Sequence, residues 1–230
     1  MATYERIREG IFIERPNRFI AHGLVEGNPE IIHVKNTGRC KELLTPQATI
    51  YLQYNADPKR KTNWDLIAVK KGARLINMDA QIPNKVVDEW LVKEALFKQI
   101  NLIRPETKYK SSRFDFYVEA DNQKIFIEVK GVTLEQDGVA MFPDAPTARG
   151  VRHLEELIAA IKEGYEAYVI FVIQMEKVRY FTPNKEMDPV FAKTLKEAKR
   201  AGVNILALDC LVTDTSIVAN KEVPVVWEGL

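Results

Sequence analysis

The hydrophobic pattern of this chain changes type near Pro83, and that change limits the folds open to it. Between Ile11 and Met78 the apolar stretches are short, rich in β-branched and aromatic residues, and interrupted by Pro, Gly and Asn. Such stretches are typical of antiparallel strands joined by turns, as in a small barrel or a sandwich. At about 70 residues, a five-stranded barrel of the oligonucleotide-binding type is the most economical choice.

After Pro83, helical and strand patterns alternate. Asn84 is placed to cap a helix that runs through residues 86–100. Apolar runs further along the chain have the composition of strands that are buried on both faces. The two patterns together predict an α/β chain with a β-barrel over residues 1–82 and a mixed-sheet domain over residues 83–230.

The composition is that of a folded protein, with 46% hydrophobic residues, 28% charged residues and a formal net charge of +1. Its two cysteines, Cys40 and Cys210, fit neither a disulfide framework nor a paired zinc-ligand motif. The first residues are too charged for a signal peptide, and no apolar run approaches the roughly 18 residues of a membrane span. We therefore expect a cytoplasmic protein that is not inserted in a membrane.

Charge is distributed unevenly along the chain. Residues 1–85 carry 14 Lys and Arg against 9 Asp and Glu, a net charge of +5, whereas residues 86–230 carry 19 against 23, a net charge of −4. A basic N-terminal half suits a polyanion, and an acidic C-terminal half suits cations. An ordinary solvated surface produces similar imbalances, so the charge alone does not decide the function.

The stretch from Ser111 to Gly131 predicts a β-hairpin whose register follows from its turn. With Asp121 and Asn122 at the centre of the turn, one face of the hairpin becomes wholly apolar. The pairs on that face are Phe114 with Val129, Phe116 with Ile127, and Val118 with Ile125. On the other face Asp115 lies opposite Glu128, and Arg113 lies opposite Lys130.

Two directly opposed carboxylates repel each other unless a cation lies between them. Hard divalent ions such as Mg²⁺ or Mn²⁺ take oxygen ligands, so we predict Asp115 and Glu128 as metal ligands. Lys130 shares a face with Glu128 because side chains alternate along a strand, and it is the third predicted catalytic residue. An Asp followed across a hairpin by Glu-x-Lys is the active-site pattern of PD-(D/E)xK nucleases. The alternative is a solvated polar face of alternating charge.

Four segments give the chain a resemblance to a known family. They are HVKNTGRCKELL at 33–44, SSRFDF at 111–116, EVKGVTL at 128–134 and FPDAPTARGVRHLEEL at 142–157. With them the chain resembles the sugar fermentation stimulation protein family over nearly its whole length. The resemblance implies an oligonucleotide-binding barrel followed by a PD-(D/E)xK nuclease-like domain, with Asp115, Glu128 and Lys130 as the active-site triad. It also implies non-specific DNA binding. Cys40 departs from the methionine expected after Gly-Arg.

Nucleases of this type often add a carboxylate from the first helix of the domain. Asp88, Glu89 and Glu94 compete for that role, and the alternative for each is a surface acid on an amphipathic helix.

Further residues are candidates for contacts with nucleic acid. They are Lys35, Asn36, Arg39 and Lys41 in the barrel, and Arg149 and Arg152 where Thr147 is placed to cap a helix. His153, in the same helix, is expected to be a hydrogen-bonded structural histidine.

Two functions compete on this evidence. The first is a Mg²⁺- or Mn²⁺-dependent nuclease that acts on DNA or RNA. The second is a non-catalytic protein of the same fold that binds DNA without sequence specificity or acts as a regulator of sugar metabolism. The intact pattern of paired carboxylates and lysine favours the first.

Overall fold

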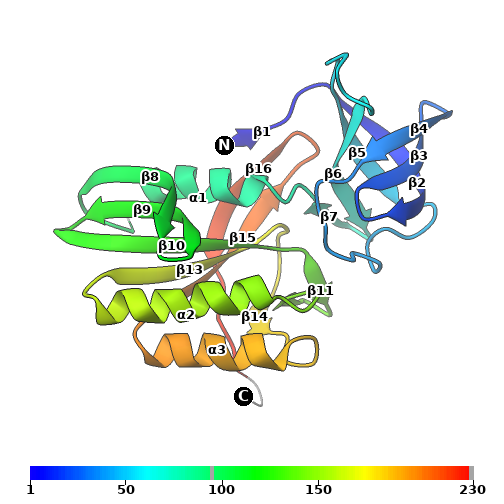
Figure 1. The fold of residues 1–230 in the computed structure, drawn as a ribbon. Coiled ribbons are helices and arrows are strands. Elements are labelled where there is room, and N and C mark those ends of the chain that lie inside the picture. The colour runs from blue at the N-terminus through cyan, green and yellow to red at the C-terminus, as the bar shows by residue number, and fades with distance from the viewer. Residues whose placement is uncertain (94–95, 228–230) are drawn as a thin grey trace.

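The structure is a computed structural model that describes residues 1–93 and 96–227, which form a small barrel and a larger sheet domain side by side (Figure 1). The barrel strands are β2 (Ile7–Asn17), β3 (Ile20–Val25), β4 (Asn28–His33), β5 (Thr49–Tyr54) and β6 (Trp64–Lys71), and β7 (Arg74–Asn77) extends the sheet beyond β6. They are ordered β4-β3-β2-β5-β6, and β4 also pairs with β6. That last pairing closes the ring and confirms the predicted five-stranded barrel.

The larger domain is built on a seven-stranded mixed sheet. Its order is β1-β16-β15-β13-β10-β9-β8, in which β10, β13 and β15 run parallel and the flanking pairs are antiparallel. The strands are β1 (Ala2–Thr3), β8 (Ile100–Tyr109), β9 (Ser112–Ala120), β10 (Gln123–Val132), β13 (Glu166–Ile173), β15 (Asn204–Val212) and β16 (Ser216–Glu222). The predicted α/β class with a mixed sheet is confirmed.

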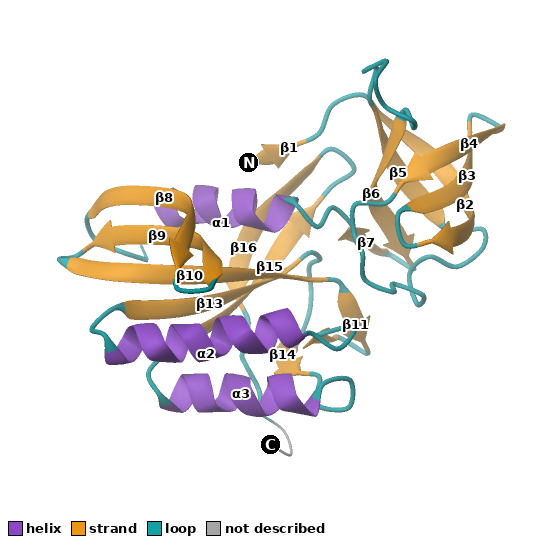
Figure 2. Cartoon of the chain, viewed as in Figure 1, coloured by secondary structure: helices purple, strands orange, loops and turns teal. Residues whose placement is uncertain are grey.

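Helices cover both faces of this sheet (Figure 2). Helix α1 (Ile82–Lys93) packs against β10, β13 and β16, whereas α2 (Ala148–Lys162) packs on the opposite face with α3 (Pro189–Arg200) beside it. A small sheet of β11 (Leu134–Gln136), β12 (Val139–Phe142) and β14 (Tyr180–Pro183) lies next to the N-terminal end of α2. Across the described ranges, no helix is both long enough and apolar enough to cross a membrane.

Two predictions of element boundaries differ from the structure. Residues 2–3 were placed with the barrel but pair with β16 in the larger sheet. The helix expected through residue 100 ends at Lys93, and β8 begins at Ile100 because it pairs with most of β9. The carboxylate of Asp121 accepts hydrogen bonds from the backbone N–H groups of residues 98 and 99, at 3.0 and 2.9 Å, and so directs the chain into β8.

Asn84 is not the cap of α1, because that helix begins two residues earlier at Ile82. The turn before the helix is held instead by Asp79, whose Oδ1 accepts a hydrogen bond from the Gln81 N–H at 2.9 Å. The side chain of Asn84 is therefore left for another contact, described below.

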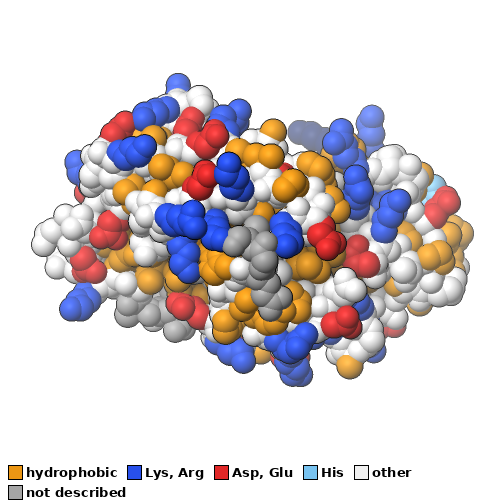
Figure 3. All heavy atoms as spheres, turned by 90° about the horizontal axis from the view of Figure 1, so that it is seen from below, with side chains coloured by type: hydrophobic (Ala, Val, Ile, Leu, Met, Phe, Trp, Pro, Cys, Tyr) orange, Lys and Arg blue, Asp and Glu red, His pale blue; other side chains and the backbone are white. Residues whose placement is uncertain are grey.

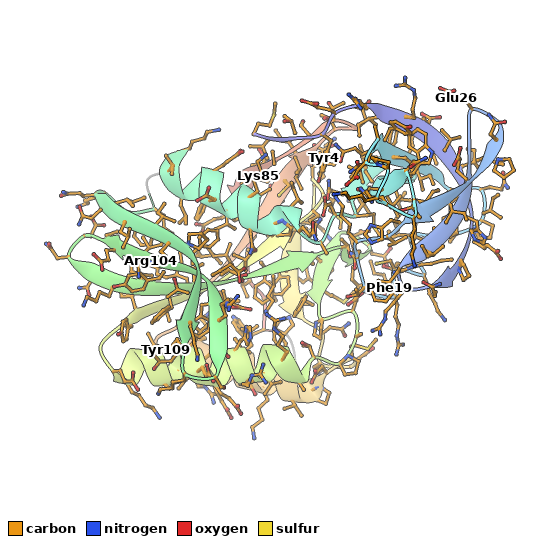
Figure 4. All side chains as sticks on the ribbon, turned by 45° about the horizontal axis from the view of Figure 1, so that its top comes forward. Tyr4, Phe19, Glu26, Lys85, Arg104 and Tyr109 are labelled. Carbon is orange, nitrogen blue, oxygen red and sulfur yellow. The ribbon has the colours of Figure 1, made fainter. Side chains whose placement is uncertain are left out.

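Buried amides tie the barrel to the larger domain. Gln174, at the end of β13, donates from Nε2 to Asn77 Oδ1 at 2.9 Å and to the Asp79 carbonyl at 3.0 Å. Asn77 Nδ2 donates in turn to the hydroxyl of Tyr4 at 2.9 Å, and Tyr4 lies at the junction between the two parts (Figure 4). These bonds fix the barrel next to the end of β10.

Candidate active site and nucleic-acid interface

The predicted hairpin register is confirmed from the turn as far as Phe116, which pairs with Ile127. Beyond that pair β9 leaves β10 and continues along β8, so Asp115 does not pair directly with Glu128. Phe114 consequently packs on the α2 side of the sheet, with its ring centroid 5.2 Å from that of Phe126. The single apolar face predicted for the hairpin is therefore divided between the two faces of the sheet.

Arg113 does not face Lys130. It lies opposite Lys108 on β8, and its exposed guanidinium is 3.9 Å from the Glu106 carboxylate. Arg113 is thus separated from the other three polar residues of the hairpin.

The carboxylate of Asp115 occupies the place where the two strands part. Its Oδ2 accepts a hydrogen bond from the Val129 N–H at 2.7 Å, which replaces the missing backbone partner. Its Oδ1 accepts a hydrogen bond from Nδ2 of Asn84 in α1 at 2.8 Å. Burial and repulsion from Glu128 raise the pKa of Asp115, although both hydrogen bonds and Lys130 oppose that shift.

Glu128 lies beside it on β10 and is only 3% exposed. Its Oε1 accepts hydrogen bonds from Lys130 Nζ and, at 2.5 Å, from His153 Nδ1. Burial opposes ionisation of Glu128, but the charge of Lys130 and the hydrogen bonds from His153 and Lys130 outweigh it and lower its pKa. Oε2 of Glu128 is buried and has no hydrogen-bond partner among the described residues.

His153 projects from α2 into the core and is 2% exposed. Its Nε2 accepts a hydrogen bond from Arg149 Nε at 3.3 Å, which leaves the proton on Nδ1 to be donated to Glu128. The four-residue spacing of Arg149 and His153 indicates a contact between these two side chains, because it places both on one face of a helix. Arg149 and Arg152 are both exposed, and Arg149 also holds the His153 ring through this hydrogen bond.

Of the three acids proposed for the first helix, the two that the structure describes do not join the site. Asp88 is exposed, and Glu89 forms an ion pair with the amino group of Met1. Glu94 lies outside the described residues. The α1 residue that contacts the site is Asn84, whose functional contact was not predicted because it was assigned to a cap.

The four barrel candidates divide into two kinds. Lys35 is largely buried, with Nζ 3.0 Å from Asp79 Oδ2 and 3.8 Å from Asp65 Oδ2. Asn36 shapes its own loop, because its Oδ1 accepts a hydrogen bond from the Gly38 N–H at 2.8 Å. Only Arg39 and Lys41 are exposed.

Arg39 and Lys41 line a groove of about 300 Å³ together with two arginines that the sequence did not single out, Arg15 and Arg18. We call this hollow the basic groove, after these four residues. Arg15 donates to backbone carbonyls of residues 18, 36, 38 and 39, at 2.6–3.0 Å, and so fixes the groove wall. A view from below shows Lys and Arg side chains spread over this whole face of the molecule, the barrel end included (Figure 3).

A second hollow, of about 170 Å³, lies between the barrel and the larger domain, and we call it the interdomain pocket. Its barrel wall is the loop 36–38, and its opposite wall begins at Gly131, the residue after Lys130. The loop approaches closely because position 38 is glycine, since a Cβ there would lie 2.1 Å from Asp144 Oδ2. Thr37 and Gly38 line both the pocket and the basic groove.

Comparison with known proteins agrees with this two-part structure. The family model described as the SfsA N-terminal OB domain matches residues 13–78, and the sugar fermentation stimulation protein RE domain matches residues 81–216. The chain belongs to the sugar fermentation stimulation protein family.

Similar members of the family come from several organisms. A homolog from Clostridium beijerinckii is 63% identical and covers 93% of this chain and 95% of its own. One from Ruminiclostridium cellulolyticum is 60% identical, with coverage of 96% and 98%. The solved structure of Pyrococcus furiosus SfsA in complex with Ca²⁺ is 30% identical, has a TM-score of 0.89, and is matched over 98% of this chain and 99% of that chain.

The paired carboxylates fit a divalent ion that takes only part of its coordination from protein. Among the described residues, no group of three or more His, Cys, Asp and Glu side chains is arranged to enclose a metal. Mg²⁺, however, commonly binds through one or two carboxylates and completes its shell with water and substrate phosphate. The unpartnered Oε2 of Glu128 and the nearby carboxylate of Asp115 are oxygen donors of the kind that such an ion takes.

Proposed function

We propose that this protein is a metal-dependent nuclease that hydrolyses phosphodiester bonds of DNA or RNA. The observation that carries the proposal is the buried, unpartnered Oε2 of Glu128 beside Asp115, on a strand that also presents Lys130. A buried carboxylate oxygen without a partner is costly, and a cation would relieve that cost. The Ca²⁺ complex of the Pyrococcus relative supports a divalent ion in this family.

In this proposal Asp115 and Glu128 hold Mg²⁺ or Mn²⁺, which supplies Lewis acidity toward a phosphate and an acidified water. The chain's own groups do the rest. Asn84 and the Val129 N–H orient Asp115, and His153 orients Glu128. Lys130 is an ammonium with three donors, so it can turn from Glu128 to a phosphate oxygen and stabilise the negative charge that develops there.

We assign nucleic-acid binding to the basic groove. Arg18, Arg39 and Lys41 are exposed and are placed to contact phosphates, which positions a strand without reading its sequence. Lys35 is left out of this assignment because its ammonium is already paired with Asp79 and Asp65.

A second candidate function is binding without cleavage. The contact of Lys130 with Glu128 favours it, because a permanent ion pair there would neutralise Glu128 without a metal. In that case the barrel alone would act on nucleic acid.

Incubation of the pure protein with single-stranded DNA, duplex DNA and RNA, each with Mg²⁺, Mn²⁺ or EDTA, separates the two. We expect cleavage with either metal, none with EDTA, and none by Lys130→Ala, whereas the exposed Lys124→Ala on the same strand cleaves normally. Absence of cleavage under every condition, with binding intact, would leave the binding protein.

A further inference from the structure

We propose that the interdomain pocket binds one unpaired nucleobase of the substrate, next to the phosphate that is cleaved. The inference rests on the proposed function, because it describes the substrate of that same site. It predicts that the substrate is single-stranded, or is opened locally, where it meets the enzyme.

The first support is the division of charge between the two neighbouring hollows. The basic groove presents Arg15, Arg18, Arg39 and Lys41, whereas the described residues that line the pocket include no Lys or Arg and do include Asp144. A carboxylate repels phosphate, but it accepts hydrogen bonds from the N–H groups on the edge of a base. The two hollows therefore suit the two chemically different parts of one nucleotide chain.

The second support is continuity. Thr37 and Gly38 form part of both hollows, so a strand whose phosphates lie in the groove passes directly to the mouth of the pocket. The far wall of the pocket starts at Gly131, the residue that follows Lys130 on β10. A base in the pocket is thus carried by a nucleotide adjacent to the catalytic strand.

The third support is the nature of the walls. Val132, Met141 and Phe142 provide apolar surface, and Asn36, Thr133 and Asp144 provide polar groups. Flipped bases are bound in this way, stacked on apolar side chains and hydrogen-bonded along one edge. Oδ2 of Asp144 accepts a hydrogen bond from the Arg39 N–H at 3.1 Å, which leaves Oδ1 for a ligand.

The size of the pocket suits a single base better than a base pair. Its volume of about 170 Å³ equals that of roughly six liquid waters at ~30 Å³ each, which is room for a single ring system. A base that is paired in a duplex must therefore open before it can enter.

The test compares the affinity of the full-length protein, in EDTA, for two fluorescent 12-mers measured by anisotropy. One is single-stranded thymidine, and the other is an abasic strand with the same number of phosphates. We expect the base-bearing strand to bind at least about fivefold more tightly, as for one stacked base.

Ala80 is exposed and lines the pocket, so Ala80→Leu fills the pocket without placing a larger side chain in the core. We expect it to reduce the affinity for the thymidine strand to that for the abasic strand and to leave the latter unchanged. Ala73→Leu, exposed in the barrel and outside the pocket lining, is the matched control and should change neither affinity. Asp144→Asn keeps an acceptor for the Arg39 N–H but presents an amide to the ligand, so it should change the order of preference among adenine, cytosine and thymine 12-mers.

Equal affinity of the parent for the two strands, equal weakening of both by Ala80→Leu, or an unchanged base order in Asp144→Asn would each overturn the base pocket. Binding in EDTA is independent of cleavage. A protein that discriminates bases but cuts nothing keeps the pocket and loses the nuclease, whereas one that cuts without discriminating bases loses only the pocket.

Discussion

The charged side chains of the basic groove on the barrel differ in exposure from those of the hairpin site on β9 and β10. In the groove, Arg18, Arg39 and Lys41 are exposed and ready to meet an anion. At the hairpin, Glu128 is buried, and each charged group is tied to a specific neighbour. Exposed charges act at a distance and are weakened by salt, whereas buried charges act locally and depend on geometry.

The difference indicates that the two regions have separate functions. The groove is suited to hold a polyanion regardless of its sequence, and the hairpin is suited to hold a metal and act on one bond. Changes at the hairpin should therefore abolish chemistry and spare binding, and changes in the groove should do the reverse.

The largest expected effect is on cleavage. Glu128→Gln replaces a carboxylate by a much poorer ligand for a hard cation, so we expect metal-dependent cleavage to fall by at least about a hundredfold. Affinity for single-stranded DNA in EDTA should stay within about twofold of the parent, because phosphate contacts dominate that affinity. Gel assays and anisotropy check the two values. Glu155→Gln, exposed on α2, is the control, and a parallel loss of binding in Glu128→Gln would break the proposed division.

The next effect concerns His153, which touches Glu128 and acts through it. Removing a partner that orients a metal ligand typically costs about 10–100-fold in metal affinity, and we expect that loss for His153→Ala. His153→Asn can still donate an N–H toward Oε1 of Glu128 and should recover part of it. Calorimetric titration with Mn²⁺ measures the affinity directly. Equal losses in both variants would mean that His153 serves packing alone.

A smaller effect is expected for groove charges. Arg39→Ala and Lys41→Ala should each weaken binding to all sequences about equally and lower the slope of log affinity against log salt by about 0.7–0.9. Lys35→Ala should leave that slope unchanged and lower the melting temperature, because its ammonium is paired with Asp79 and Asp65. A strong dependence on DNA sequence would point to base contacts in the groove.

The smallest expected effect is on the stability of the metal-free protein, which replacement of the two carboxylates should change in opposite directions. Burial and Glu128 raise the pKa of Asp115, so folding disfavours its charged form, and Asp115→Asn should stabilise the protein by about 1 kcal/mol at pH 7. Asn84 can rotate its amide to accept from the new side chain. Despite burial, Lys130 and His153 lower the pKa of Glu128, so Glu128→Gln should destabilise by a similar amount.

The sign of the pH dependence follows from the same pKa directions. An acid whose pKa is raised in the folded state costs stability as the pH rises from its unfolded pKa to its folded pKa. An acid whose pKa is lowered contributes stability that is lost as the pH falls from its unfolded pKa to its folded pKa. The Asp115 difference should therefore disappear below about pH 4, near the unfolded pKa of an aspartate. The Glu128 difference should shrink but persist there, because its folded pKa is lowered. Urea unfolding in EDTA at pH 7 and pH 3.5 measures them. Shifts of the same sign in both variants would contradict the opposite environments found for the two groups.

The sequence predicted the hairpin because its register depends on local pattern. The turn at Asp121 and Asn122 and the alternation of apolar residues were enough to pair residues 116–120 with 123–127. Where β9 turns toward β8, the partner is another strand, and no pattern within the hairpin records it. The prediction that Asp115 lies directly opposite Glu128 was wrong for that reason.

The supporting contacts could not be predicted because they are tertiary. Asn84, His153 and Arg15 each act on a residue more than 20 positions away, through a polar side chain that has an ordinary local explanation. From the sequence alone, Asn84 is interpreted as a helix cap and His153 as a structural histidine. Their contacts follow only from the packing of α1 and α2 against the sheet. The basic groove likewise forms from two segments, residues 15–18 and 37–44, that only barrel closure brings together.

The central claim is that Asp115 and Glu128 hold a divalent ion, and thermal unfolding with and without Mn²⁺ tests it most directly. An ion that binds only the folded state raises the melting temperature by mass action. We predict a rise for the parent and for Lys130→Ala, whose lysine is not a ligand, and little or none for Glu128→Gln. No rise in the parent, or the same rise in all three proteins, would contradict a metal site at the hairpin.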